Sequence, residues 1–181
     1  MSTRVILTYA DLAALPDDGK RYELHEGEIS VSPSPRTRHQ RAVAKLHLIL
    51  ANHVDRRGIG EIFVPPIDVI LSNITVLVPD LVYVDTSRAG IVSERAIEGA
   101  PTLAIEVLSR STTAKDVGVK LQLYARYGVP HYWIVDADAR VIETRQLVDG
   151  AYVLGPRLEG DAPVTLPPFP DLVLDPADVW R

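Results

Sequence analysis

Hydrophobic and polar positions follow two different periods along this chain of 181 residues. A period near 3.6 residues, typical of an amphipathic helix, predicts helices at residues 9–15, 35–56 and 113–127. Short runs rich in β-branched and aromatic residues, bounded by Gly and Pro, predict strands. These strands are expected at residues 22–25, 28–31, 61–64, 67–71, 79–84, 102–108, 131–135, 141–147 and 151–154. The mixture, without an internal repeat, favours an α/β fold with a mixed sheet flanked by helices and with extra β-hairpins.

The length suits one domain, residues 1–181, with a core at about residues 20–147. The last segment, residues 155–181, is rich in proline, and we expect it to dock on the core through four apolar residues. These are Phe169, Leu172, Leu174 and Trp180.

Composition excludes several classes of site and location. The chain has no cysteine, which excludes disulfides, zinc–thiolate sites and thiol catalysis. No apolar stretch approaches the roughly 18 residues of a membrane span. The first residues reach Asp11 too soon to hold the core of a signal peptide. No Gly-rich nucleotide loop is present, so we expect no nucleotide cofactor, and we expect a cytoplasmic protein with no membrane partner.

The formal net charge of −5 is unevenly distributed. Residues 36–57 hold six basic side chains and a single acid, Asp55. Such a basic helix on an acidic body could face phosphates, and a solvated helix face is the alternative. The candidate nucleic-acid-binding residues are Arg36, Arg38, Arg41 and Lys45.

Three residues carry most of the chemical information. Asp80 follows Val-Pro before an expected strand, Glu106 interrupts a six-residue apolar run, and Lys120 lies on the next expected helix. A charge in an apolar run is costly unless it is paired or bound to metal. Two carboxylates that hold a hard divalent cation, with an ammonium nearby, are what metal-assisted phosphodiester hydrolysis requires. The alternatives are a turn carboxylate, a buried structural acid and a surface lysine paired with Asp116, respectively.

Further candidates are weaker. His39 lies one turn before the apolar stripe of its helix and could touch phosphate or metal-bound water, although a satisfied, half-buried histidine is the more ordinary role. Glu28 and Glu23 flank the first hairpin and could add a carboxylate, with solvent exposure the expectation for Glu23. Ser109 and the hydroxyl residues after it precede a helix, where N-capping explains them.

An ordered set of motifs resembles a known family. The segments are Arg21-Tyr-Glu-Leu-His-Glu-Gly-Glu28, Ser32-Pro-Ser-Pro35, Val78-Pro-Asp-Leu-Val-Tyr-Val84, Glu98-Gly-Ala-Pro101, Glu106-Val-Leu-Ser109, Lys120 with Leu123-Tyr-Ala125, and Tyr132-Trp-Ile-Val-Asp136. Together they resemble the Uma-two family of restriction-endonuclease-like bacterial proteins, within the PD-(D/E)xK nucleases, over about residues 7–152. The usual pattern places lysine two residues after the glutamate, where this chain has Leu108.

This resemblance implies a restriction-endonuclease-like fold and a Mg²⁺- or Mn²⁺-dependent endonuclease. Asp80, Glu106 and the Val107 carbonyl would bind the metal, Lys120 would be the lysine that has migrated to the following helix, and Tyr124 would be accessory. DNA is the implied substrate, with RNA not excluded, and a homodimer is the implied assembly. The rival hypothesis is a catalytically silent nucleic-acid-binding or regulatory protein on the same fold, because fold alone does not fix function.

Overall fold

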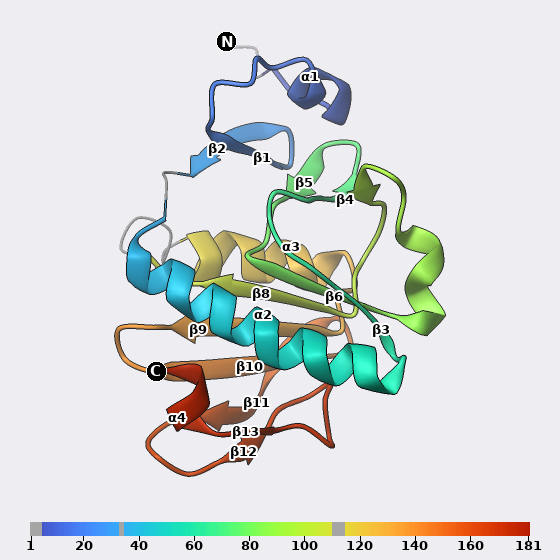
Figure 1. The fold of residues 1–181 in the computed structure, drawn as a ribbon. Coiled ribbons are helices and arrows are strands. Elements are labelled where there is room, and N and C mark those ends of the chain that lie inside the picture. Colours follow the sequence, from blue (N-terminus) through green and yellow to red (C-terminus); the bar gives the residue numbers. More distant parts are fainter. Residues whose placement is uncertain (1–4, 33–34, 110–114) are drawn as a thin grey trace.

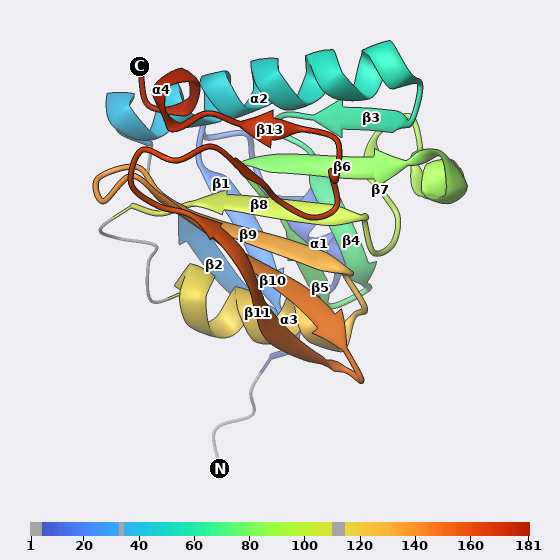
Figure 2. The same ribbon diagram turned by 90° about the horizontal axis from the view of Figure 1, so that it is seen from below.

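The computed structural model of this protein describes residues 5–32, 35–109 and 115–181. Its centre is a six-stranded mixed sheet in the order β11-β10-β9-β8-β6-β3. Strands β8 and β9 run parallel, and the other neighbours run antiparallel. Helix α2 covers one face of this sheet and α3 covers the other (Figure 2). The strands are β3 (Gly60–Phe63), β6 (Leu81–Asp85), β8 (Leu103–Val107), β9 (His131–Asp136), β10 (Val141–Val148) and β11 (Ala151–Leu158).

A second, five-stranded sheet has the order β2-β1-β5-β4-β7. Figure 1 shows it beyond the β6 side of the central sheet, with α1 above it. Its strands are β1 (Arg21–His25), β2 (Glu28–Ser32), β4 (Asp68–Ser72), β5 (Thr75–Leu77) and β7 (Ala96–Ile97). Strands β12 (Val164–Thr165) and β13 (Val173–Leu174) form a separate small pair near the C-terminus.

The helices begin and end where local chemistry predicts. Thr8 and Asp11 form a reciprocal capping box at the start of the first helix, and Gly58, with φ of 60°, ends the long one. Asp175 caps the last helix through its side chain. The helices are α1 (Tyr9–Ala13), α2 (Thr37–Arg57), the 3₁₀ helix η1 (Thr86–Ile91), the π-helical turn η2 (Lys115–Lys120), α3 (Leu121–Arg126) and α4 (Pro176–Val179).

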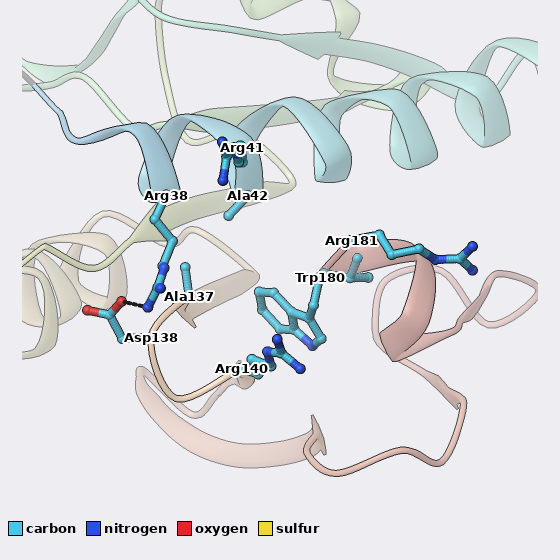
Figure 3. A pocket seen from close by; sticks show the side chains of 9 residues that line it. Arg38, Arg41, Ala42, Ala137, Asp138, Arg140, Trp180 and Arg181 are labelled. Carbon is cyan, nitrogen blue, oxygen red and sulfur yellow. Dashed lines mark hydrogen bonds and ion pairs between the residues drawn. The ribbon is translucent and has the colours of Figure 1, made fainter.

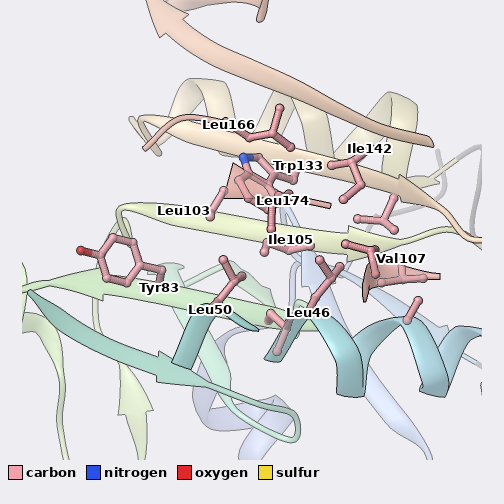
Figure 4. Packing of buried hydrophobic residues seen from close by; sticks show 14 of the residues in the cluster. Leu46, Leu50, Tyr83, Leu103, Ile105, Val107, Trp133, Ile142, Leu166 and Leu174 are labelled. Carbon is pink, nitrogen blue, oxygen red and sulfur yellow. The ribbon is translucent and has the colours of Figure 1, made fainter. Parts of the chain in front are cut away.

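The largest hydrophobic core lies between α2 and the central sheet (Figure 4). Leu46 and Leu50 of α2 are fully buried against alternate residues of β8 and β9. The opposite face of the same strands packs against α3 in a second cluster. Since neighbouring side chains of a strand point to opposite faces, Val107 belongs to the α2 side and Glu106 to the α3 side. The fold therefore delivers an acid to the α3 face of a central strand.

The C-terminal segment closes the first core, as its composition predicts. Phe169 and Leu174 are buried in it, and Leu172 and Trp180 pack against it. The Trp133 indole N–H donates to the carbonyl of Pro167 at 2.7 Å, which fixes the segment on β9.

The predicted elements appear in the expected order, and the differences have local causes. The short strands β5, β7, β12 and β13 were not expected, because two- and three-residue runs give no clear alternation. The helix expected at residues 113–127 is a π-helical turn followed by α3, and its first two residues lie outside the described part. Val117, expected in the buried stripe of this helix, is 42% exposed, because a π turn rotates side chains away from the α-helical register.

Within the described residues, no helix is long and apolar enough to cross a bilayer.

Truncation of Leu50 tests the packing of α2. We expect Leu50→Ala to lower the free energy of unfolding by about 2–5 kcal/mol, because it removes a fully buried side chain and leaves a cavity. Urea unfolding followed by circular dichroism measures the loss. Leu48→Ala, on the same helix but 57% exposed, is the matched control and should change it by less than about 0.5 kcal/mol. Equal losses in both variants would contradict the observed packing.

Candidate active site

The carboxylate of Asp80 lies where β6 begins and β8 ends. The ladder between these strands reaches the pair Leu81–Ile105, and the Asp80 N–H donates to the Ile105 carbonyl at 3.0 Å. One step further along β8, the Val107 N–H donates to Oδ2 of Asp80 at 2.9 Å. The side chain therefore continues the hydrogen-bond ladder past the end of its own strand, which fixes the orientation of its carboxylate.

Glu106 is held from the α3 face of β8. Its Oε1 accepts hydrogen bonds from Lys120 Nζ at 2.8 Å and from the Tyr124 hydroxyl at 2.9 Å. Lys120 ends the π-helical turn, and Tyr124 lies one turn later in α3. Single π turns recur at functional sites, where they redirect side chains. Here the last residue of the turn is a lysine that points into the protein.

The surface-lysine alternative for Lys120 is wrong. The residue is only 4% exposed, and its ammonium contacts two carboxylates, those of Glu106 and Glu23. The side chain of its alternative partner, Asp116, lies outside the described residues.

Glu23 is the site residue that the sequence reading misjudged. It was expected to be exposed, but it is 1% exposed, and Oε1 lies 2.8 Å from Lys120 Nζ. The same oxygen accepts the Val78 N–H at 2.8 Å, and Oε2 contacts His25 Nε2 at 3.2 Å. A hairpin is usually interpreted as having one solvated face, but Glu23 and Leu24, which point to opposite faces of β1, are both buried. Polar and apolar residues alternate along β1 as in an ordinary half-exposed strand, so the sequence carries no local signal that Glu23 is buried.

For the carboxylates of Glu23 and Asp80, burial raises the pKa, and the charged and hydrogen-bonding partners lower it. Burial alone would raise the pKa of Glu23, but Lys120, His25 and the Val78 N–H outweigh it and lower the pKa to about 2. Burial likewise opposes ionisation of Asp80, whose pKa is nevertheless lowered by His39, the Val107 N–H and Lys120.

Tyr124 behaves as a permanent hydrogen-bond donor. Complete burial, and then the negative charge of Glu106, raise the pKa of its hydroxyl well above the usual value. The hydroxyl therefore keeps its proton and orients the Glu106 carboxylate.

His39 of α2 completes the surroundings of Asp80. Its Nε2 lies 3.0 Å from Asp80 Oδ2, and the ring is 8% exposed, more deeply buried than the half-buried position expected. Within the described part of the chain, Nδ1 of this ring has no hydrogen-bond partner. On the other carboxylate oxygen, Arg21 makes a long contact of 3.4 Å.

A small cavity opens between these groups. Asp80, Glu106, Lys120 and His39 all line it, and its volume is about 30 Å³. That volume holds a water molecule or a cation, because one water needs only about 10–15 Å³. The predicted acids and lysine are thus brought to one cavity, although their roles remain predictions.

The residues present fit a divalent cation of the Mg²⁺ type with few protein ligands. No group of three His, Asp or Glu side chains in the described ranges has the spacing of a preformed metal site. Mg²⁺ is commonly held by only one or two carboxylates and keeps several waters, so Asp80 and Glu106 on one cavity meet this requirement. Glu23 and Glu106 share the Lys120 ammonium, whereas Arg21 and His39 contact Asp80.

The other predicted residues lie outside this cavity. Glu28 is exposed and is not among the residues that line it. Arg36 and Arg38 line an adjoining hollow at the start of α2, and Arg41 lines the next one. Lys45, one turn later, is part of neither hollow.

Comparisons with known proteins identify a family and a shared fold. The model of the Uma2 family, described as "Putative restriction endonuclease", matches residues 9–177. No curated protein matches the sequence. Among solved structures, a "putative nuclease belonging to DUF820" from Anabaena variabilis ATCC 29413 superposes with a TM-score of 0.78 at 22% identity. The superposition covers 96% of this chain and 97% of that one, so the two proteins share a fold.

Removal of the Lys120 ammonium should strongly destabilise the protein. We expect Lys120→Ala to lower the free energy of unfolding by about 3–5 kcal/mol, because Glu23 and Glu106 would then be buried without their shared cation. Urea denaturation measures this change. Lys20→Ala, which removes an exposed ion pair with Asp18, is the control and should have little effect. A small change in both variants would show that the buried cluster is not an ionic one.

Acid should destabilise the protein partly through Glu23. A carboxylate whose pKa is lowered by folding contributes stability that is complete above its unfolded pKa, near 4.5, and is lost as the pH falls toward its folded pKa of about 2. We therefore expect the free energy of unfolding of Glu23→Gln to fall less steeply over this range, by up to about 1.4 kcal/mol per pH unit. Urea unfolding between these pH values, with Glu28→Gln as the exposed control, measures the slope. Parallel slopes in Glu23→Gln and the parent would contradict the assignment.

Proposed function

We propose that this chain, which belongs to the Uma2 family, is a nuclease that hydrolyses phosphodiester bonds with the help of Mg²⁺ or Mn²⁺. Asp80 and Glu106 would hold the cation, with the Val107 carbonyl as a further ligand, and Lys120 would act beside it. DNA is the proposed substrate, in keeping with the description of the family. A cytoplasmic location and a homodimer stay predictions.

One observation carries the proposal: Asp80, Glu106 and Lys120 come from three separate elements and line a single cavity. The cavity gathers two buried carboxylates, with Lys120, Arg21 and His39 beside them, from parts of the chain that are far apart. Burying charged groups is costly unless they are paired or bound to metal, and a hard divalent cation prefers oxygen ligands of this kind.

Each side chain has a task that follows from its contacts. A bound divalent cation would supply charge stabilisation at the phosphate and lower the pKa of a water molecule. Lys120, held by two carboxylates, carries a positive charge and can orient the attacking water or stabilise negative charge on the phosphate. Tyr124 orients Glu106, and His39 with the Val107 N–H orients Asp80, so neither carboxylate needs to reorganise when it binds.

Glu106→Gln tests both the metal and the reaction. We expect Mn²⁺ to bind the parent in isothermal titration, and to bind Glu106→Gln at least about tenfold more weakly, since a good charged ligand contributes more than 1.4 kcal/mol. We also expect the parent to nick supercoiled DNA with Mn²⁺ and the variant to lose this activity. Glu28→Gln, the same change at an exposed position outside the cavity, should keep both properties.

The outcomes separate the alternatives. Equal Mn²⁺ binding by the parent and Glu106→Gln would place the metal elsewhere. Absence of cleavage by a folded parent, with DNA binding retained, would favour the catalytically silent nucleic-acid-binding protein. Circular dichroism establishes that each variant is folded before either assay.

A further inference from the structure

A cluster of arginines surrounds two hollows beside the candidate active site. The first hollow, of about 290 Å³, is lined by the start of α2 and by the loop after β9. The second, of about 310 Å³, lies between α2, the same loop and α4 (Figure 3). Across the described residues, one carboxylate, that of Asp138, lines them against five arginines: Arg36, Arg38, Arg41, Arg140 and Arg181. On a chain with an acidic net charge, this local positive excess calls for an anionic partner.

Most of these guanidinium groups are not neutralised within the protein. In the described part of the chain, Arg36, Arg41 and Arg140 form no ion pair. Arg38 pairs with Asp138 across the hollow, but both side chains are more than two-thirds exposed, so solvent screens the pair (Figure 3). Arg181 is instead bound to α4, through the Ala177 carbonyl and Asp178, and is not one of the groups available to a ligand.

The start of α2 adds to the positive potential. This helix of 21 residues has an arginine as its N-cap, with no side-chain cap, and its first turn contains no acid. Basic residues are unfavourable at a helix N-terminus, where the helix dipole and the unpaired N–H groups already attract anions. Arginines at this position therefore lower the free energy of unfolding of the protein without ligand. A bound anion would turn the same positive charge into a favourable interaction.

The two hollows and the acidic cavity form a continuous series. The cavity with Asp80 shares His39 and Ser109 with the first hollow, and the first shares Arg38, Ala137 and Asp138 with the second. A ligand that follows them passes from the carboxylates, over the first turn of α2, to the side of α4. A single phosphate would fill only one of these hollows. A chain of phosphates could contact all three, because neighbouring hollows share lining residues.

We propose that the two arginine-lined hollows bind the sugar–phosphate backbone of a nucleic-acid strand whose scissile phosphodiester lies at Asp80 and Glu106. Arg36 would meet the phosphate nearest the cavity, and Arg41 with Arg140 would meet phosphates further along the strand. Only the position of the scissile group rests on the proposed function. Contacts of this kind hold the strand in register without reading its sequence.

A double variant, Arg41→Gln with Arg140→Gln, tests this path. The probe is a fluorescein-labelled DNA duplex and its single-stranded form, titrated by fluorescence anisotropy with EDTA present, between about 50 and 200 mM salt. The logarithm of the affinity falls as the logarithm of the salt concentration rises, and each lost phosphate contact makes this slope shallower by about one. The slope of the double variant should therefore be shallower than that of the parent by about two. The loss should be similar for unrelated sequences, because backbone contacts carry no sequence information.

The control removes the same amount of charge at the far end of α2. Arg56→Gln with Arg57→Gln alters exposed arginines in the last turn of α2 and should leave the slope within about 0.5 of the parent value. Equal losses in both double variants would overturn the proposal, because the effect would then reflect net charge alone. Failure of the parent to bind either DNA form, or an unchanged slope in the first variant, would also overturn it.

The test separates this inference from the nuclease proposal. If the parent binds DNA, the first double variant loses the expected slope and no cleavage occurs with Mn²⁺, the path stands and the nuclease proposal fails. If the parent cleaves DNA and the slope is unchanged, the nuclease proposal stands and the path fails.

Discussion

The ammonium of Lys120 between the carboxylates of Glu23 and Glu106 is the interaction on which the site depends. It joins three parts of the fold: β1 of the five-stranded sheet, β8 of the central sheet, and the π-helical turn before α3. Each partner is nearly inaccessible to solvent, so each charge has lost most of its hydration. The two sheets meet at this point through ionic contacts, and the lysine helps to lower the pKa of Glu23 there despite its burial.

Replacing such a cluster by apolar side chains of similar size often costs little or even adds stability, so stability alone does not explain its presence. The proposed functional site would explain it. The PD-(D/E)xK pattern places its lysine where this chain has Leu108. Leu108 packs against the hydrophobic cluster between the central sheet and α3. The charge reaches Glu106 from the following helix instead, at 2.8 Å. If the proposed function is correct, the same chemistry is assembled from a different part of the chain, at the expense of holding a long side chain in one buried conformation.

Helix α2 connects the candidate active site with the basic surface. Its inward face fills the main core with Leu46 and Leu50 and also carries His39 to Asp80. Its first turns present arginines to the two hollows beside α4. Because one helix carries both His39, which contacts Asp80, and the arginines of its first turns, the fold holds these arginines in place beside the carboxylates. A strand bound along the arginines would be placed relative to the acids without any movement of the backbone.

The sequence by itself indicated the order of the main helices and strands, the apolar residues through which the C-terminal segment packs, and the three candidate residues that the fold brings to one cavity. Those features are encoded locally, in side-chain periodicity, in Gly and Pro, and in charges that stand in apolar runs. Tertiary structure decided the remaining features. Glu23 became buried because β1 is covered on both sides, Val117 became exposed because a π turn changed the helical register, and Arg140 joined the arginines of α2 because α4 and the β9–β10 loop meet there. Each of these depends on contacts between residues far apart in the chain, which no local pattern records.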